Sequence, residues 1–159
     1  MTSVKEAASV FLANDRIAVT GVSRAPQGHG SNAVYKRLRA RGYDVFAVNP
    51  NADEVEGDRC YHDLRDIPGG VDAVVIATRP ESAEDTMRAC SELGVKHVWM
   101  HRALGEGSVC DKATVYGRDH DVTVIDGGCP LMFDPAADVG HKMLRFVLTR
   151  TGKVPKTVS

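Results

Sequence analysis

Residues 42–51 read Gly-Tyr-Asp-Val-Phe-Ala-Val-Asn-Pro-Asn, and this stretch carries the clearest signal of the fold. A glycine, which favours the left-handed cap that ends a helix, precedes a short apolar run. Proline cannot continue a hydrogen-bonded ladder and keeps Asn49 extended, so the strand ends there. The stretch therefore predicts a strand over 43–48 that follows a helix and ends at a defined point.

The alternation of strand and helix continues on both sides of this stretch. Short runs rich in β-branched residues predict four more strands, over Arg16–Thr20, Asp72–Ala77, Lys96–Met100 and Val122–Ile125. Their nearly continuous apolar character is typical of parallel strands that are buried on both faces. Helices are predicted over 2–13, 31–41, 82–93, 108–120 and 137–149. The last of these has apolar residues near helical spacing, namely Val139, Met143, Phe146 and Val147, and the tail from Gly152 is expected to fray.

Strands that alternate with helices indicate βαβ units with right-handed crossovers. We therefore expect an α/β fold, a doubly wound parallel sheet of five strands in the order 3-2-1-4-5 with flanking helices. No repeat or linker marks a second domain, so residues 1–159 are expected to form one domain. Ligands in such sheets bind outside the carboxyl ends of the strands where the order reverses, here between the first and fourth strands.

The composition excludes several classes of function. A net charge of -1, from 20 Lys and Arg against 21 Asp and Glu, argues against general attraction to nucleic acid. No apolar run approaches the roughly 20 residues that span a bilayer. The cysteines form no C-x-x-C pair, so we expect neither a metal site nor a disulfide framework, and a cytoplasmic protein with reduced thiols at Cys60, Cys90, Cys110 and Cys129.

The loop after the first strand, residues 21–32, combines glycine, hydroxyl and guanidinium groups. Backbone N–H groups at the start of the next helix, near Gly30 to Asn32, can hold anionic oxygens. Ser23 and Ser31 can add hydroxyl donors, and Arg24 a forked contact to phosphate. The alternative is an ordinary turn in which a serine caps the helix.

Two further strand tips carry candidate ligand contacts. The amide of Asn49, before Pro50, can meet a ribose or adenine edge, although an Asx turn would explain it equally well. In Thr78-Arg79-Pro80, the guanidinium is expected to project into the same crevice as Arg24 and to help clamp a phosphorylated nucleotide. The alternative is an exposed ion pair with a nearby glutamate.

The loops after the fourth and fifth strands hold a histidine and a cysteine. His101 can act as a general base, but no nucleophile is visibly paired with it, so a crevice-lining hydrogen-bonding role is the simpler interpretation. Cys129 would be reactive only if a basic neighbour or a helix start lowered its pKa. The remaining histidines lack metal spacing and are expected to be structural or exposed to solvent.

Taken together, these segments resemble the small CoA-binding proteins related to the N-terminal domain of the succinyl-CoA synthetase α subunit. The resemblance covers roughly residues 14–135 and rests on segments 17–23, 42–51, 72–80, 94–100 and 129–130. It implies a Rossmann-like fold that binds the 3′-phospho-ADP part of CoA across the loops after the first three strands. By position this carries over to Ser23, Arg24, Asn49, Pro50, Thr78, Arg79 and Pro80.

The resemblance has departures and limits. Relatives commonly carry Gln two residues after the tryptophan of the fourth strand, where this chain has His101 and then Arg102. Such proteins also lack the phosphohistidine and ATP-grasp domains of the ligase. The chain is too short to hold either, so synthesis of acyl-CoA by this chain alone is not expected.

The leading hypothesis is a binding or regulatory module that holds coenzyme A or an acyl-CoA without making or breaking a bond. The alternatives are an NAD(P)-dependent oxidoreductase and a thiol-exchange enzyme that uses Cys129. The sequence Gly28-x-Gly30-x-x-Ala33 matches a dinucleotide fingerprint, but six residues separate it from Gly21, and no acidic residue ends the second strand. A homodimer or an unidentified partner protein is compatible with the regulatory role. The expected binding residues are Gly21, Ser23, Arg24, Gly30, Ser31, Asn49, Pro50, Thr78, Arg79, Pro80 and His101.

Overall fold

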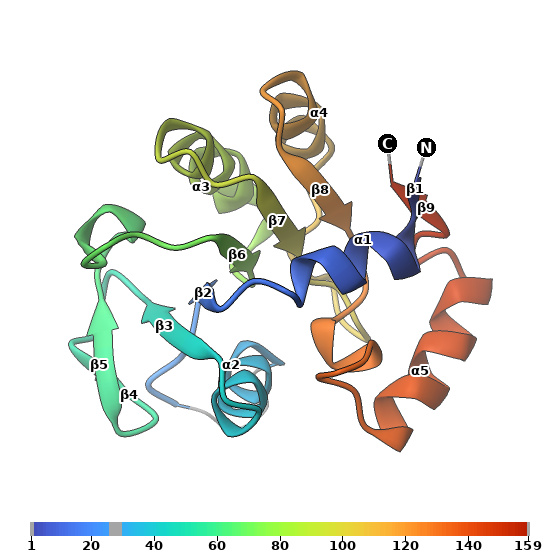
Figure 1. Cartoon of the computed structure of the whole chain (residues 1–159), viewed down its shortest axis with the longest axis horizontal. Coiled ribbons are helices and arrows are strands. Elements are labelled where there is room, and N and C mark those ends of the chain that lie inside the picture. Colours follow the sequence, from blue (N-terminus) through green and yellow to red (C-terminus); the bar gives the residue numbers. More distant parts are fainter. Residues whose placement is uncertain (1, 26–29, 159) are drawn as a thin grey trace.

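The structure is a computed structural model, which describes residues 2–25 and 30–158. Its main sheet has seven strands among these residues, in the order β4-β5-β3-β2-β6-β7-β8 (Figure 1). Neighbouring strands pair in parallel except in the β4–β5 hairpin. The strands are β2 (Arg16–Thr20), β3 (Asp44–Val48), β4 (Glu54–Val55), β5 (Asp58–Tyr61), β6 (Ala73–Ile76), β7 (His97–Met100) and β8 (Thr123–Asp126).

Helices cover both faces of the sheet, which gives the molecule two cores. Along β2, Ile17 and Val19 enter one core and Ala18 enters the other, so alternate side chains are buried on opposite faces. The first core lies under α1 (Val4–Phe11) and α2 (Gly30–Ala40). The second lies under α3 (Pro80–Glu92), α4 (Asp111–Asp119) and the short helix η1 (Leu64–Asp66). The α/β class with a doubly wound, largely parallel sheet is thus confirmed.

The predicted strand count and strand order are wrong. The five predicted strands all form, but they lie in the order 2-1-3-4-5, because the third of them, β6, pairs with β2. The short strand β5 takes the place beyond β3. Its sequence, Asp-Arg-Cys-Tyr, is short and polar, and it follows a tight turn at Glu56 and Gly57, both with positive φ. The point where the order reverses therefore lies between β2 and β6.

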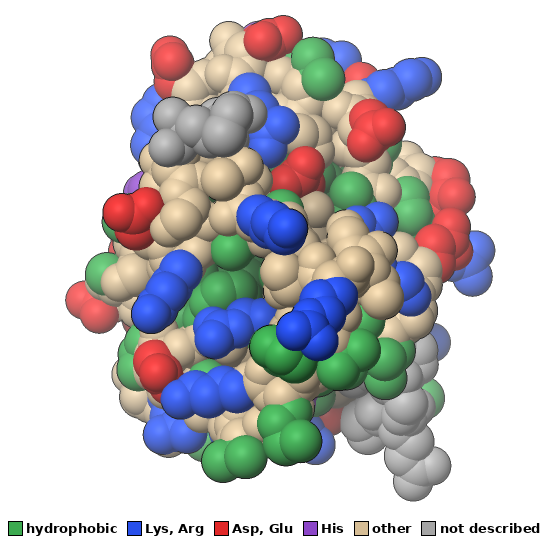
Figure 2. Space-filling model, turned by 90° about the vertical axis from the view of Figure 1, so that its right-hand side faces the viewer, with side chains coloured by type: hydrophobic (Ala, Val, Ile, Leu, Met, Phe, Trp, Pro, Cys, Tyr) green, Lys and Arg blue, Asp and Glu red, His purple; other side chains and the backbone are tan. Residues whose placement is uncertain are grey.

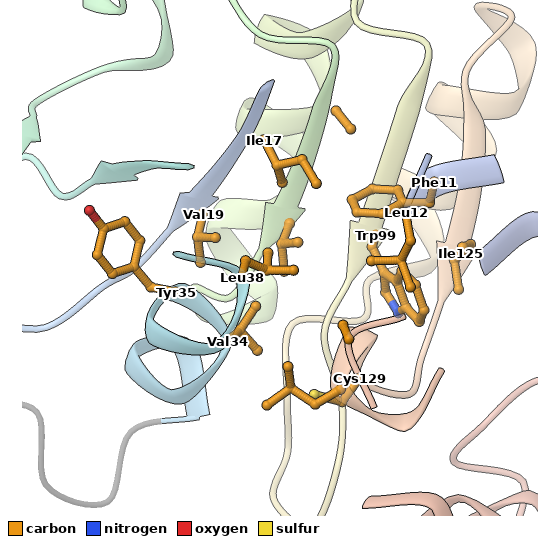
Figure 3. Close-up of a cluster of buried hydrophobic side chains, with 14 of the residues drawn as sticks. Phe11, Leu12, Ile17, Val19, Val34, Tyr35, Leu38, Trp99, Ile125 and Cys129 are labelled. Carbon is orange, nitrogen blue, oxygen red and sulfur yellow. The ribbon is translucent and has the colours of Figure 1, made fainter. Parts of the chain in front are cut away.

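Trp99 of β7 anchors the centre of the first core. It is fully buried, and its ring meets that of Phe11 edge-on with centroids 5.3 Å apart (Figure 3). Its indole N–H donates a hydrogen bond of 2.9 Å to the carbonyl oxygen of Gly127. This bond fixes the chain that follows β8, which contains the short helix η2 (Pro130–Met132).

The C-terminal helix α5 (Val139–Arg150) forms where a helix was expected, but its predicted apolar face points outward. The inward residue Leu148 is only 5% exposed. Figure 2 looks onto this side of the molecule, and hydrophobic side chains are interspersed with Lys and Arg over the lower part of the view. The outward-facing apolar residues, 55–75% exposed, are Val139, Met143, Phe146 and Val147.

The expectation of a frayed tail from Gly152 is wrong. Strand β9 (Thr157–Val158) pairs antiparallel with β1 (Thr2–Ser3), so the two ends of the chain lie side by side (Figure 1). Val154 is 1% exposed and joins the first core. No helix among the described residues is long and apolar enough to cross a membrane.

Candidate functional site

A cavity of about 720 Å³ opens at the carboxyl edge of the sheet, across the loops after β2, β3, β6 and β7. This is the edge at which open α/β sheets bind ligands. The cavity brings together eight of the eleven predicted site residues, from four separate loops and from the start of α2. They are Gly21, Gly30, Ser31, Asn49, Pro50, Thr78, Arg79 and His101.

The other three predicted residues lie elsewhere. Ser23 and Arg24 line an adjoining hollow of about 490 Å³, which shares Asn49 with the main cavity. Pro80 is the first residue of α3 and lines neither hollow. The two arginines expected to form one clamp, Arg24 and Arg79, thus line different hollows.

The loop after β2 passes very close to the loop after β6. Gly21 has a φ of +76°, and a Cβ added there would lie 2.6 Å from the carbonyl oxygen of Ala77. Only glycine therefore permits this approach. The hydroxyl of Ser31 donates a hydrogen bond of 3.0 Å to the carbonyl oxygen of Gly21, which ties the start of α2 to the same crossing.

Two asparagine side chains hold this loop in shape. Asn32, 1% exposed, accepts a hydrogen bond from Ser23 N and donates one to Ser23 O, each of 2.8 Å. Asn49 donates to Val22 O at 2.9 Å and accepts from Asn51 N at 2.9 Å. The second bond is the Asx turn that was the alternative for this position. Only the backbone N–H of Asn32 was expected to take part, although a side-chain amide in the first turn of a helix is a signal for such a contact.

His101 lies between the cavity and the first residue of α2. A Cβ added at Gly30 would lie 3.1 Å from its ring carbon Cε1. Burial, with a smaller contribution from the charge of His141, lowers the pKa of His101 to about 4, so its ring is neutral at pH 7. Within the described parts of the chain, neither ring nitrogen has a hydrogen-bond partner.

Cys129 also lines the cavity, but its side chain belongs to the first core (Figure 3). The residue is 2% exposed. Burial raises the pKa of its thiol to about 12, so the thiol stays protonated at neutral pH and is a poor nucleophile. This environment weighs against thiol exchange.

His141 lines the same cavity from α5, although it was expected to be structural or solvent-facing. Asp138 caps the helix by accepting a 2.8 Å hydrogen bond from His141 N, and it accepts a second, of 2.7 Å, from the ring Nδ1. The Nη2 atom of Arg37, from α2, lies 3.1 Å from the same carboxylate. The backbone hydrogen bond, the ring and Arg37 lower the pKa of Asp138. No spacing in the sequence links α2, α5 and this cavity.

The described residues contain no group of three or more His, Cys, Asp or Glu side chains that could hold a metal ion. Gly28 of the partial dinucleotide fingerprint lies outside the described residues. The other two residues of that motif, Gly30 and Ala33, both line the cavity.

Several known proteins are similar to this chain. The ADP-forming acetate–CoA ligase II of Archaeoglobus fulgidus is 35% identical over 82 residues, which is 50% of this chain and 12% of the ligase. The alpha subunit of the corresponding Pyrococcus furiosus enzyme is 37% identical over 83 residues, 52% of this chain and 18% of the subunit. The matched regions thus span less than a fifth of the length of these curated relatives.

The fold has counterparts among solved structures. A hypothetical protein from Pyrococcus horikoshii OT3 superposes with a TM-score of 0.69 and 27% identity, covering 76% of this chain and 82% of that protein. The sequence model of a family described as CoA binding domain matches residues 15–135, which include the loops after all the parallel strands. The chain belongs to this CoA-binding domain family, and its fold is Rossmann-like.

Proposed function

We propose that the chain holds coenzyme A or an acyl-CoA, with the 3′-phospho-ADP moiety lying across the loops after β2, β3 and β6, and that it acts as a non-catalytic binding or regulatory module. The observation that carries this proposal is the cavity of about 720 Å³ at the carboxyl edge of the sheet. It gathers glycine, amide, hydroxyl and guanidinium groups from consecutive loops in a chain of the CoA-binding domain family.

The charges around the cavity favour an anionic ligand. Helix α2 begins at the cavity wall, and the first N–H groups of a helix attract anionic oxygens. Arg79 adds a guanidinium to the main cavity and Arg24 adds one to the adjoining hollow. None of the described residues lining these two hollows is acidic. A third hollow, of about 510 Å³, is less suitable for phosphates because the carboxylates Asp63, Asp85 and Glu92 line it beside His62, Arg65 and Arg88.

The side chains in the cavity support binding better than catalysis. The thiol of Cys129 is protonated at neutral pH because burial raises its pKa. In the described ranges, no hydrogen bond joins His101 or His141 to a hydroxyl or thiol that would serve as a nucleophile. The hydroxyl of Ser108 donates to the carbonyl oxygen of Thr78 and thereby braces the loop after β6.

Isothermal titration calorimetry with CoA, 3′-dephospho-CoA and NAD tests the proposal. We expect CoA to bind roughly tenfold or more tightly than 3′-dephospho-CoA, because the extra phosphate gains charge-assisted hydrogen bonds. Arg24→Gln and Arg79→Gln identify the arginine that reads the phosphate, since the change at that position reduces the preference. Arg88→Gln, at an α3 residue paired with Glu84, is the matched control and leaves the preference unchanged.

Equal affinities of the wild-type chain for CoA and 3′-dephospho-CoA would argue against recognition of the 3′-phosphate. Tighter binding of NAD than of CoA would instead favour the oxidoreductase alternative. Loss of the CoA preference in Arg88→Gln as well would show that net charge, and not a local contact, produces it.

A further inference from the structure

One end of the main cavity has a different chemical character from the strand tips that suit the nucleotide. In the sheet, the loops after β7 and β8 lie on the far side of β6 from β3. There the lining includes Leu104, Cys129, Leu131, His141 and Leu144, which we call the α5 end of the cavity. Leu131, Leu144, the protonated thiol of Cys129 and Leu104, which is 71% exposed, make this end largely apolar, and the imidazole of His141 is the polar group among these five residues.

The α5 end is built partly by residues outside the family match. The match covers residues 15–135, whereas His141 and Leu144 belong to α5. The helix is held in place by the Arg37–Asp138 ion pair and by a 3.2 Å hydrogen bond from Arg145 Nη1 to the carbonyl oxygen of Met132. Helix α5 is therefore a fixed wall of the cavity that lies outside the residues matched by the family.

We propose that the α5 end is a subsite for the acyl group of a short-chain acyl-CoA, and that Leu144 limits the length of that chain. This inference rests on the proposed binding of CoA. A nucleotide at the tips of β2, β3 and β6 directs its pantetheine arm along the cavity toward the loops after β7 and β8. Because about 720 Å³ must hold this arm as well, the space left at the α5 end suits only a short acyl chain.

An acyl group adds one polar group to CoA, the thioester carbonyl, and two imidazoles line the cavity where it is proposed to lie. Asp138 engages Nδ1 of His141, which leaves Nε2 as the ring nitrogen available to a ligand. His101 lines the same cavity as a neutral ring without hydrogen-bond partners in the described residues. The neutral ring of His101 has one N–H to donate to the thioester carbonyl, and Nε2 of His141 donates to it when that ring is an imidazolium paired with Asp138, while the leucines contact the alkyl chain. Free CoA has neither a thioester carbonyl nor an alkyl chain to place at the α5 end.

Calorimetry of the full chain with adenosine 3′,5′-bisphosphate, CoA, acetyl-CoA, butanoyl-CoA and octanoyl-CoA tests the subsite. We expect acyl-CoA to bind more tightly than CoA, with a gain of up to roughly fourfold for each methylene buried between acetyl and butanoyl. Octanoyl-CoA, too long for the subsite, should lose this gain. This series uses the wild-type chain and so does not depend on whether any variant folds.

Substitutions on the cavity face and on the outer face of α5 test the subsite directly. Leu144→Phe narrows the subsite and should remove the preference for butanoyl-CoA, while the affinity for CoA stays within twofold. His141→Gln should weaken acetyl-CoA binding and leave CoA binding unchanged. Met143→Ala is the matched control because Met143 is 68% exposed on the outer face of the same helix.

The outcomes separate this inference from the proposed function. If CoA binds and 3′-dephospho-CoA binds less tightly, but all acyl-CoAs match CoA in affinity, the subsite is refuted and CoA binding stands. An equal loss for CoA and butanoyl-CoA in Leu144→Phe also refutes the subsite. If neither CoA nor the bisphosphate binds, both ideas fail together.

Discussion

His101 occupies the boundary between the cavity and the start of α2, and its protonation state follows from that position. Burial disfavours the imidazolium and lowers the pKa from 6.5 to about 4. His141 lies close enough to add a smaller effect in the same direction. A neutral ring at this position donates one hydrogen bond from one nitrogen and accepts one at the other, without repelling Arg79, which lines the same cavity.

The lowered pKa of His101 predicts a pH dependence of stability. The unfolded chain takes up this proton near pH 6.5 and the folded chain only near pH 4, so stability is complete above pH 6.5 and is lost as the pH falls toward 4. The loss from this group is up to about 3 kcal/mol. Urea unfolding of the wild type and His101→Gln at pH 7, 5.5 and 4.5 measures it. Identical pH profiles for the two proteins would contradict the assignment.

The site residues could be predicted from the sequence in so far as each follows the end of a strand. Thr78 and His101 illustrate this, because the chain order alone places them at the carboxyl edge. The sequence does not show which polar side chains form hydrogen bonds with the backbone and are therefore engaged before a ligand binds. Asn49 was expected to contact a ligand, yet the nitrogen and the oxygen of its side-chain amide both form hydrogen bonds within the loops. Conversely, His141 carries no motif and enters the cavity only because α5 packs there.

At the scale of elements, the crossing of the loops after β2 and β6 decides the shape of the cavity floor. Thr20 at the end of β2 accepts a 3.2 Å hydrogen bond from Ala77 N through its hydroxyl. Gly21 then passes within van der Waals contact of Ala77. Any side chain at Gly21 must push the two strand ends apart, at the point where helices leave for opposite faces of the sheet.

A pair of glycine substitutions tests this close approach. Gly42→Ala should cost about 1 kcal/mol, because Gly42 has a φ of +88° but no atom within 4 Å of an added Cβ. Gly21→Ala has the same backbone strain and also a Cβ 2.6 Å from a carbonyl oxygen, so roughly 3 kcal/mol or more is expected. Urea unfolding measures both free energies. Equal losses would mean that the loops separate without strain.

The β4–β5 hairpin is one of the elements that sequence patterns missed. Its contacts with α2 are polar: the hydroxyl of Tyr35 donates to Asp58 at 2.6 Å, and Asn32 donates to Glu56 at 2.9 Å. Arg39 pairs with the same carboxylate of Asp58 at 2.6 Å. Because these contacts join residues about twenty positions apart through side chains, no local periodicity predicts them. They hold α2, whose first residues line the cavity, along its length from Asn32 to Arg39.

At the scale of the whole molecule, the C-terminal segment closes the first core. Val154 packs beneath the chain that follows β8, where Lys153 O accepts a 3.2 Å hydrogen bond from Gly128 N. The β1–β9 pair then joins the two ends of the chain. This arrangement fixes the turn that carries Cys129 and Leu131 and hence the α5 end of the cavity.

Truncating the side chain of Val154 tests whether the C-terminal segment is packed into the first core or only loosely attached. Val154→Ala should reduce the free energy of unfolding by about 2 kcal/mol, because it removes two methyl groups from a residue that is 1% exposed. Val147→Ala, at a residue 55% exposed on α5, is the control and should change stability by less than about 0.5 kcal/mol. Chemical denaturation gives both values. A negligible effect at Val154 would show that the tail is not part of the core.

The sequence by itself determined the fold class, the existence of the five main strands and the edge at which the loops collect. These follow from apolar periodicity and from Gly and Pro at element ends, which act over a few neighbouring residues. Only the tertiary structure decided the strand order, the separation of Arg24 from Arg79 and the entry of His141 and Leu144 into the cavity. Those features depend on which distant surfaces bury one another, and that is settled by the packing of the whole chain.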